Sequence, residues 1–196
     1  MLRSGFFFLL ILFGSLNLQA QSTMPVRISV FNESTSIPFT RFFTTPVHPG
    51  IEAGTALKWK ETGHWRIYPS VSIGYLFHNK LFQAVYVQVE LNCDYQLDFG
   101  LNIKSSLGVG YMHSFTTQQE FSFENGVYTS RADRGNSRFM TSLSLGLGYR
   151  LKPSQPNSAE IFVMYRTWAE YPYSPGFIPV MTHTNLHVGS VFYPFK

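Results

Sequence analysis

Apolar and polar residues alternate along most of this chain with a period of two. Between Leu107 and Tyr111, apolar residues occupy every odd position and glycines every even one. The alternation covers residues 51–60, 66–78, 85–95, 101–111 and 139–150, with weaker runs at 160–169 and 184–195 and a short first run at 26–31. Because successive side chains of a strand point to opposite faces, the pattern predicts eight β-strands, each with an apolar and a polar face.

Eight two-faced strands predict an all-β, antiparallel, up-and-down barrel, but either face can turn inward. A soluble lipocalin-like barrel buries the apolar face around a small hydrophobic ligand, whereas a transmembrane β-barrel exposes that face to lipid. The strand glycines all lie on the polar face: Gly54, Gly74, Gly108, Gly110, Gly146, Gly148 and Gly189. Since an eight-stranded barrel is just wide enough for side chains, small residues belong inside, which favours the transmembrane arrangement.

Aromatic residues and loop lengths favour the same arrangement. The aromatic residues gather near two rims, one with Trp59, Tyr95, Tyr149 and Phe192 and the other with Phe77, Tyr111, Phe115, Phe139 and Tyr165. Aromatic belts of this kind form at the two lipid–water interfaces. On one side, connections 34–50, 116–137 and 170–183 are long and 79–80 is short, whereas 61–65, 96–100 and 152–158 on the other side are all short. Long outer loops and short periplasmic turns are typical of outer-membrane barrels.

The first twenty residues predict export. Met1–Ala20 combines Arg3, an apolar run from Phe6 to Phe13 and a more polar end, which is the pattern of a secretory signal peptide cleaved after Ala20. The apolar run is too short for a transmembrane anchor. Cleavage leaves residues 21–196 as the barrel domain. The single cysteine, Cys93, can form no internal disulfide and does not lie at the cleavage site, where a lipid anchor would need one.

Composition limits the partners. Charged residues make up only 13% of the chain, aromatic residues 17%, and the net charge is +4. A typical soluble domain has about 25% charged residues, so this surface is unusually apolar. No dense basic patch suggests nucleic acid as a partner.

Three segments resemble a known group of proteins. They are Leu-Gly-Val-Gly-Tyr at 107–111, Leu-Gly-Leu-Gly-Tyr at 145–149 and the closing run from Leu186 to Lys196. Together with the signal peptide, they resemble the small outer-membrane β-barrel proteins of bacteria, particularly those of the Bacteroidota type. The resemblance implies a location in the outer membrane, lipid as surroundings, and a last strand read by the barrel-assembly machinery. Phe195 is penultimate here and Lys196 is last, which departs from the usual aromatic end. The resemblance implies no cofactor, catalytic residue or metal ligand.

Eight charged residues lie on the polar face and are candidates for an interior network: Glu52, Lys58, Arg66, Glu90, Asp94, Lys104, Arg150 and Arg166. A turn centred near Asp98 would place Lys104 opposite Asn92 and diagonal to Glu90 and Asp94. Because buried charges must be paired, we expect a salt-bridged plug. The alternative is a conductive or catalytic lining.

The histidines offer little for catalysis. His113 and Ser114 are neighbours on a strand and therefore point to opposite faces, so they cannot form a dyad. His183 and His187 would be about 13 Å apart on a strand, too far for one metal ion, and we expect them at the rim. The His-x-Ser-Asn element of lipid A deacylases is absent. We expect a non-enzymatic barrel with a structural or surface-interaction role, or a narrow solute passage. The alternatives are the soluble lipocalin-like barrel and a lipid A deacylase or acyltransferase-like enzyme.

Two outer loops carry further information. The segment 121–128 contains Asn125-Gly126 between alternating residues, which predicts a hairpin continuing the barrel wall. The segment 37–49 is rich in aromatic residues and proline, and we expect it to form a lid over the mouth or a plug inside it. Tyr171, Tyr173 and Phe177 of the last outer loop could pack against it. An unknown ligand or protein could bind at these loops.

Overall fold

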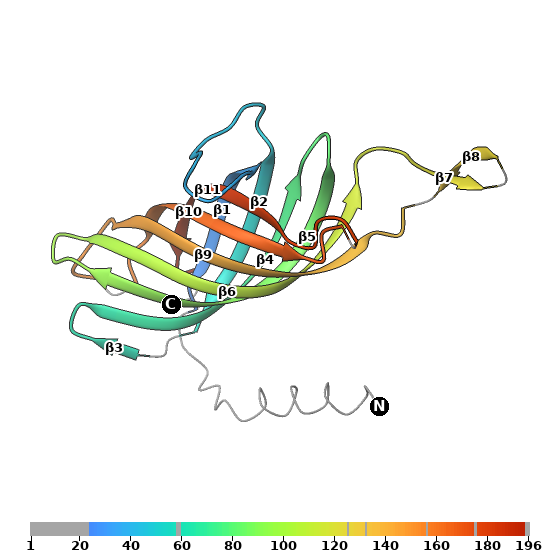
Figure 1. Cartoon of the computed structure of the whole chain (residues 1–196). Coiled ribbons are helices and arrows are strands. Elements are labelled where there is room, and N and C mark those ends of the chain that lie inside the picture. The colour runs from blue at the N-terminus through green and yellow to red at the C-terminus, as the bar shows by residue number, and fades with distance from the viewer. Residues whose placement is uncertain are drawn as a thin grey trace, which may run out of the picture.

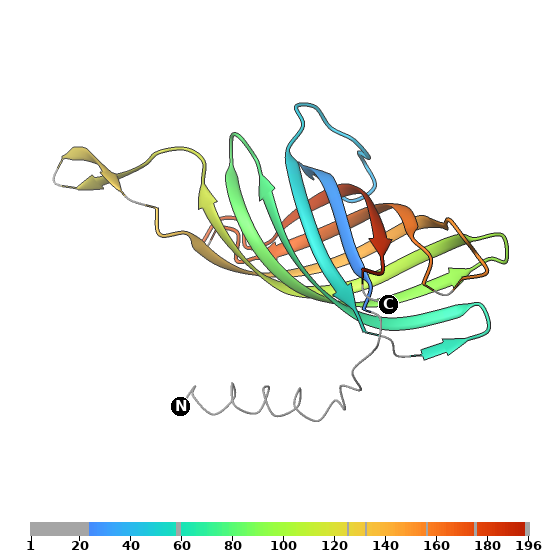
Figure 2. The same cartoon turned by 180° about the vertical axis from the view of Figure 1, so that it is seen from behind.

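The chain folds as a closed antiparallel β-barrel of eight strands (Figures 1 and 2). The computed structural model describes residues 24–57, 60–124, 126–131, 133–155, 157–174 and 176–194. The barrel strands are β1 (Val26–Thr35), β2 (Pro49–Ala56), β4 (Trp65–Phe77), β5 (Phe82–Gln96), β6 (Leu101–Thr116), β9 (Asn136–Arg150), β10 (Glu160–Tyr171) and β11 (Met181–Phe192). None of the described residues forms a helix long and apolar enough to span a membrane. The predicted fold class is confirmed.

The first strand closes the barrel. β1 pairs with β2 on one side and with β11 on the other, so the weakest of the predicted strands is present and longer than expected. The remaining barrel strands follow in the order β11, β10, β9, β6, β5, β4, and β4 pairs with β2. Every one of these eight strands therefore has two neighbours, and the barrel has no open edge.

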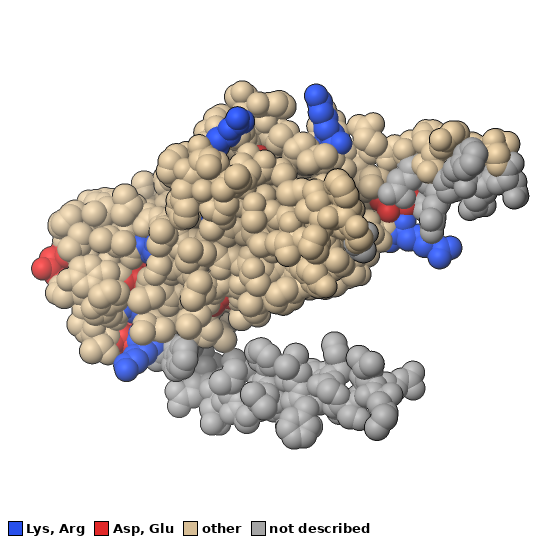
Figure 3. Space-filling model, in the orientation of Figure 1, with Lys and Arg blue, Asp and Glu red and all other residues tan. Residues whose placement is uncertain are grey.

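The polar face of each strand is inside. In β5, Tyr86, Gln88 and Glu90 are buried, whereas Val87 and Val89 between them are exposed. Many large apolar side chains are accordingly exposed on the barrel wall, and the charged side chains visible in Figure 3 gather toward its two ends. This arrangement confirms the predicted faces. A lipocalin-like barrel needs the opposite one, and the structure does not support that alternative.

The two ends of the barrel differ in their connections. At one end, here called the loop end, lie residues 36–48, 78–81, 117–135 and 172–180. At the other, the turn end, lie 57–64, 97–100 and 151–159, together with the start of β1 and the end of β11. The short strand β3 (Lys60–Thr62) extends the wall at the turn end by pairing with β4.

The predicted hairpin forms, but it does not continue the wall. β7 (Glu120–Glu124) and β8 (Val127–Arg131) pair with Glu124 directly opposite Val127, as in a tight hairpin. Gly126 has a positive φ of 81°, as such tight turns require. The two strands form a sheet separate from the barrel and project away from its loop end (Figure 1).

The segment 36–48, here called the strap, is neither lid nor plug. It folds over the outside of the wall, where the rings of Phe39 and Phe42 pack against Tyr165 of β10 with centroids 5.4 and 5.0 Å away. The backbone N–H of Phe39 donates to the Tyr165 hydroxyl (2.9 Å), and Ser36 bonds to Thr184 of β11 (2.9 Å). The outward side chains beneath the strap are polar, and the strap supplies their hydrogen-bond partners.

Candidate functional site

Two arginines and two glutamates fill the middle of the lumen. Arg166 of β10 donates to Glu90 of β5 (2.9 Å) and to both carboxylate oxygens of Glu52 of β2. Arg27 of β1 donates to the same two glutamates. The Tyr86 hydroxyl also donates to Glu52 (2.8 Å). These five residues, here called the central network, tie together four strands.

The central network has no net charge, and three of its four charged side chains have almost no contact with solvent. The side chains of Glu52, Glu90 and Arg166 are each at most 1% exposed. Bringing such charges out of water costs several kcal/mol per ion unless each is paired and hydrogen-bonded. The two arginines satisfy this condition for both glutamates, and the result is a salt-bridged plug.

A second network lies nearer the turn end. Lys104 of β6 donates to Asp94 of β5 (2.7 Å) and to Glu160 of β10 (2.7 Å). The Tyr68 hydroxyl donates to the same oxygen of Asp94, Oδ2 (2.9 Å). Lys104 is directly opposite Asp94 and not Asn92, so the predicted register is wrong by two residues. The register centres the turn after β5 on residue 99, one residue later than the sequence indicated, and Gly100 in this turn has a positive φ of 99°.

The other interior candidates are less central. Arg66 is partly exposed at the turn end and pairs with Glu61 (3.3 Å). Arg150 is buried and lies opposite Glu160 in the register. Lys58 lies outside the described residues.

Two further charged residues, not among the predicted candidates, share the same inward periodicity. Arg27 alternates with the outward residues of β1, and Glu160 begins the inward row of β10 that leads to Arg166. Both lie inside the predicted runs 26–31 and 160–169, near the ends of those runs. Applying the inward parity of each run to all of its residues would have found them.

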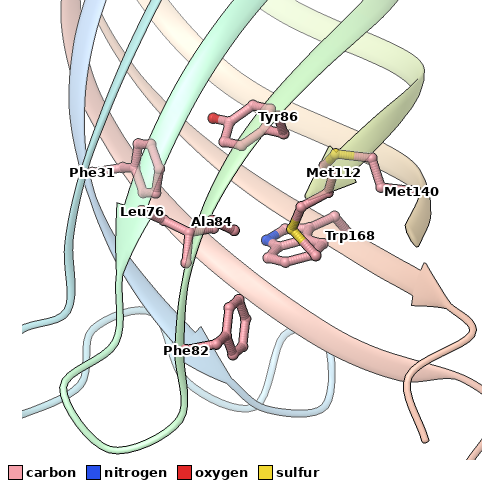
Figure 4. Close-up of a cluster of buried hydrophobic side chains, with 8 residues drawn as sticks. All are labelled: Phe31, Leu76, Phe82, Ala84, Tyr86, Met112, Met140 and Trp168. Carbon is pink, nitrogen blue, oxygen red and sulfur yellow. The ribbon is translucent and has the colours of Figure 1, made fainter. Parts of the chain in front are cut away.

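An apolar cluster occupies the lumen beyond the central network (Figure 4). Its members are Phe31, Leu76, Phe82, Ala84, Tyr86, Met112, Met140 and Trp168, contributed by six different strands. Tyr86 connects this cluster to the central network through Glu52. On the other side, Phe82 and Trp168 contact the ring of His183, with centroids 5.9 and 4.1 Å away. The interior is therefore layered: the apolar cluster lies between the charged central network and a second group of charged and polar side chains around His183.

The last layer is a buried cluster at the loop end. His183 bonds through Nδ1 to Glu33 (2.8 Å) and through Nε2 to Glu170 (3.0 Å), and Arg138 donates to Glu170. Both ring nitrogens of His183 therefore face carboxyl oxygens of glutamates on two neighbouring strands. His183 and His187 are both fully buried, so their expected place at the rim is wrong. Both point inward because they occupy the inward parity of β11.

Two more histidines complete this loop-end cluster, which consists of Glu33, His48, His78, Arg138, Glu170 and His183. The rings of His48 and His78 stack with centroids 3.5 Å apart, and His48 Nδ1 lies 3.9 Å from Glu33 Oε2. Burial lowers the pKa of His78; Glu33 opposes this shift, and His48 and His183 add to it.

The outer wall brings a serine close to a histidine. His113 and Ser137 are direct neighbours across β6 and β9. The Tyr111 hydroxyl lies 3.3 Å from His113 Nδ1 and 2.8 Å from Ser137 Oγ, so a phenol separates the serine from the imidazole. Ser114 is buried on the opposite face of β6. Neither serine is placed for activation by His113.

The architecture is similar to that of solved bacterial surface proteins. Neisserial surface protein A (NspA) superposes with a TM-score of 0.52 at 8% identity, over 87% of this chain and 95% of that one. The outer membrane enzyme PagL gives 0.49 at 11% identity, over 86% and 98%. Ail, the attachment invasion locus protein of Yersinia pestis, gives 0.45 at 13% identity, over 87% and 97%. No family model matches the chain, and the search of curated proteins gives no match.

These identities show the fold alone. The chain is an eight-stranded antiparallel barrel with the fold of the small outer-membrane β-barrels.

Proposed function

We propose that this protein is an integral β-barrel of the bacterial outer membrane, exported with cleavage of residues 1–20, that acts at the cell surface through its loop end. It is neither an enzyme nor a solute passage in this proposal. The resemblance to barrels of the Bacteroidota type belongs to the same proposal. The observation that carries it is the central network, which fills the lumen with paired charges.

The outer wall supports the membrane location. Val87, Val89, Leu107 and Leu145 are among many apolar side chains that are exposed on the barrel wall. Exposed patches of this size are rare on soluble monomers and fit lipid as surroundings. Tyr111, Phe139 and Tyr171 lie side by side on three neighbouring strands toward the loop end, as expected for an interfacial belt.

The interior supports the closed lumen. A cavity of about 140 Å³ opens at the turn end and reaches Arg27, but Glu52, Glu90 and Arg166 do not line it. Opening a path would separate Arg166 from both glutamates and leave buried charges unpaired. The apolar cluster lies beyond this point and would also have to move.

The loop end supports a surface role. The hairpin of β7 and β8 projects beyond the barrel, and Tyr128 on it is 71% exposed. Phe42 and Phe43 of the strap and Phe177 of the last loop are also exposed. Exposed aromatic residues on projecting loops are typical contacts for a protein or ligand at the cell surface.

Two measurements test this proposal. Fractionation of cells that express the full chain, with gel migration of boiled and unboiled samples, tests the location, and we expect the outer-membrane fraction and a heat-modifiable band. Planar-bilayer recording of the refolded mature chain tests the lumen, and we expect no steady conductance steps. Stable steps from the wild-type barrel would contradict the closed lumen and favour a solute passage. Recovery in the soluble fraction would contradict the membrane location. Altered lipid A on overexpression would favour an enzyme.

A further inference from the structure

Three metal-ligating side chains meet at the loop end, each from a different part of the chain. Glu33 lies near the end of β1, His48 at the end of the strap, and His78 directly after β4. One ligand atom from each lies within 4.8 Å of the others. The backbone holds Glu33 and His48 together, because the Glu33 N–H donates to the His48 carbonyl (2.9 Å).

The carboxylate of Glu33 has one oxygen held and one oxygen free. Oε1 accepts from His183 (2.8 Å) and from the Thr35 hydroxyl (3.3 Å). Oε2 has no hydrogen-bond partner, although the side chain is 0% exposed. A buried acceptor without a donor is costly in a native fold and needs an explanation. A cation at this oxygen would supply one.

We propose that Glu33, His48 and His78 bind a divalent transition-metal ion of the Zn²⁺ type. Two imidazole nitrogens and one carboxylate oxygen are a set that Zn²⁺ binds with four-coordinate geometry, with water in the fourth position. Ca²⁺ and Mg²⁺ require mostly oxygen ligands and do not fit two histidines.

Binding requires a small closure of the three side chains. Zn²⁺ bonds of about 2.1 Å in a tetrahedron need donor atoms about 3.4 Å apart. A bound ion lies in the plane of each imidazole that binds it. The stacked rings of His48 and His78 must therefore tilt until both ring planes pass through the position of the ion. His78 lies in a turn, and its contact with the backbone N–H of Lys80 is a long one (3.3 Å), so its ring can turn at little cost.

The surrounding residues orient the carboxylate. Glu33 is held by His183, His183 by Glu170, and Glu170 by Arg138, all of them buried. Outer hydrogen bonds of this kind fix a metal ligand in place, and their loss typically weakens metal binding 10–100-fold. This series of hydrogen-bonded residues also contains a fluorescent reporter of metal binding, because Trp168 stacks on His183 with planes 13° apart. The ion would join the strap to β1 and to the turn after β4.

Titration of the folded, untagged mature chain with ZnCl₂ tests the site. We expect saturable binding of one ion by calorimetry, accompanied by a change in Trp168 fluorescence and unaffected by excess Ca²⁺. His48→Gln and His78→Gln should each weaken binding on the order of 100-fold, since each removes a direct ligand. His113→Gln on the outer wall and His64→Gln at the turn end are matched controls and should bind as the wild type does.

The folding of each variant is checked by its heat-modifiable gel band before titration. Glu33→Gln and Glu170→Gln provide an independent second set, because they keep the side-chain size. The first should abolish tight binding, and the second should weaken it 10–100-fold. Absence of saturable binding to the folded wild type overturns the proposal, as does binding that survives in the folded His48→Gln and His78→Gln variants. Conductance and cell fractionation do not depend on this site.

Discussion

Gly74 of β4 lies directly opposite Tyr86 of β5, and a Cβ atom at position 74 would come within 2.2 Å of the tyrosine ring. The missing side chain leaves room for the ring inside the barrel, and the ring places its hydroxyl on Glu52. One glycine thereby makes a bond of the central network possible.

Gly74→Ala should therefore destabilise the barrel. The added methyl group must displace the Tyr86 ring, and overpacking of this kind costs typically about 1–3 kcal/mol. Urea unfolding followed by the heat-modifiable gel band measures the change. Combining the substitution with Tyr86→Leu, which removes the ring, should cost less than the sum of the two single changes. Strict additivity would show that the ring is not the obstacle.

Arg166→Met should be the most damaging change in the lumen. It leaves Glu52 and Glu90 buried with Arg27 as their remaining cation, and breaking a buried pair costs about 3–5 kcal/mol. The same unfolding assay measures it, with exposed Arg134→Met as the control. Surface changes usually stay within about 0.5 kcal/mol. A small effect at Arg166 would mean that water enters the lumen readily, which would weaken the case for a closed barrel.

Tyr165→Ala should release the strap from the outer wall. The substitution removes two aromatic contacts, worth about 0.5–1.5 kcal/mol each, and the hydrogen bond to Phe39. Cleavage by trypsin after the exposed Arg41 should then be at least about tenfold faster, since 1.4 kcal/mol corresponds to a factor of ten. Tyr111→Ala, on the wall away from the strap, is the control. Equal cleavage rates in both variants would refute the contact as the holding point.

The base of the hairpin loop should respond to acid through Asp133. Burial would raise the pKa of this carboxyl group, but hydrogen bonds from the backbone of Gly135 (2.7 Å) and Thr116 (2.6 Å) outweigh it and hold the pKa below its ordinary value of 3.8. A lowered carboxyl pKa stabilises the folded loop above pH 3.8, and this contribution is lost as the pH falls through the lowered value. The amide NMR shifts of Thr116 and Gly135 should titrate together with a midpoint below 3.8. Asp133→Asn should abolish that titration.

The alternation of residues was enough to predict the strands and their faces. Even the short run at 26–31 led to a strand, because Ile28 and Val30 point outward and Ser29 points inward. The period of two is a direct consequence of strand geometry, so it can be recognised in the sequence without knowing which strands are neighbours.

The register could not be predicted with the same certainty. Moving Lys104 from Asn92 to Asp94 keeps every side chain on its own face, because the shift is two residues. The alternation of apolar and polar residues cannot distinguish two registers that differ by two residues. The geometry of the turn at Gly100 determines which register forms. The pairing of Lys104 with Glu160 needs the neighbouring strands as well.

The loop-end cluster was harder still. Glu33 shares the inward parity of β1, but His48 and His78 lie at the end of a loop and the start of a turn, where no strand periodicity applies. His183 was visible in the sequence, but its burial depends on Trp168 and Glu170 from β10. Three-dimensional closure brings these groups together, and a single sequence carries no signal for that.

The central network also bears on the order in which the chain folds. Arg166 is 114 residues from Glu52 and 76 from Glu90 in the sequence. These bonds cannot form until β10 has joined the strands from the first half, so they cannot nucleate folding and can act only late. Contacts this distant slow the folding of a β-protein, and interactions that form after the transition state mainly slow unfolding. The bonds of Arg166 should therefore determine how long the barrel stays folded rather than how fast it folds.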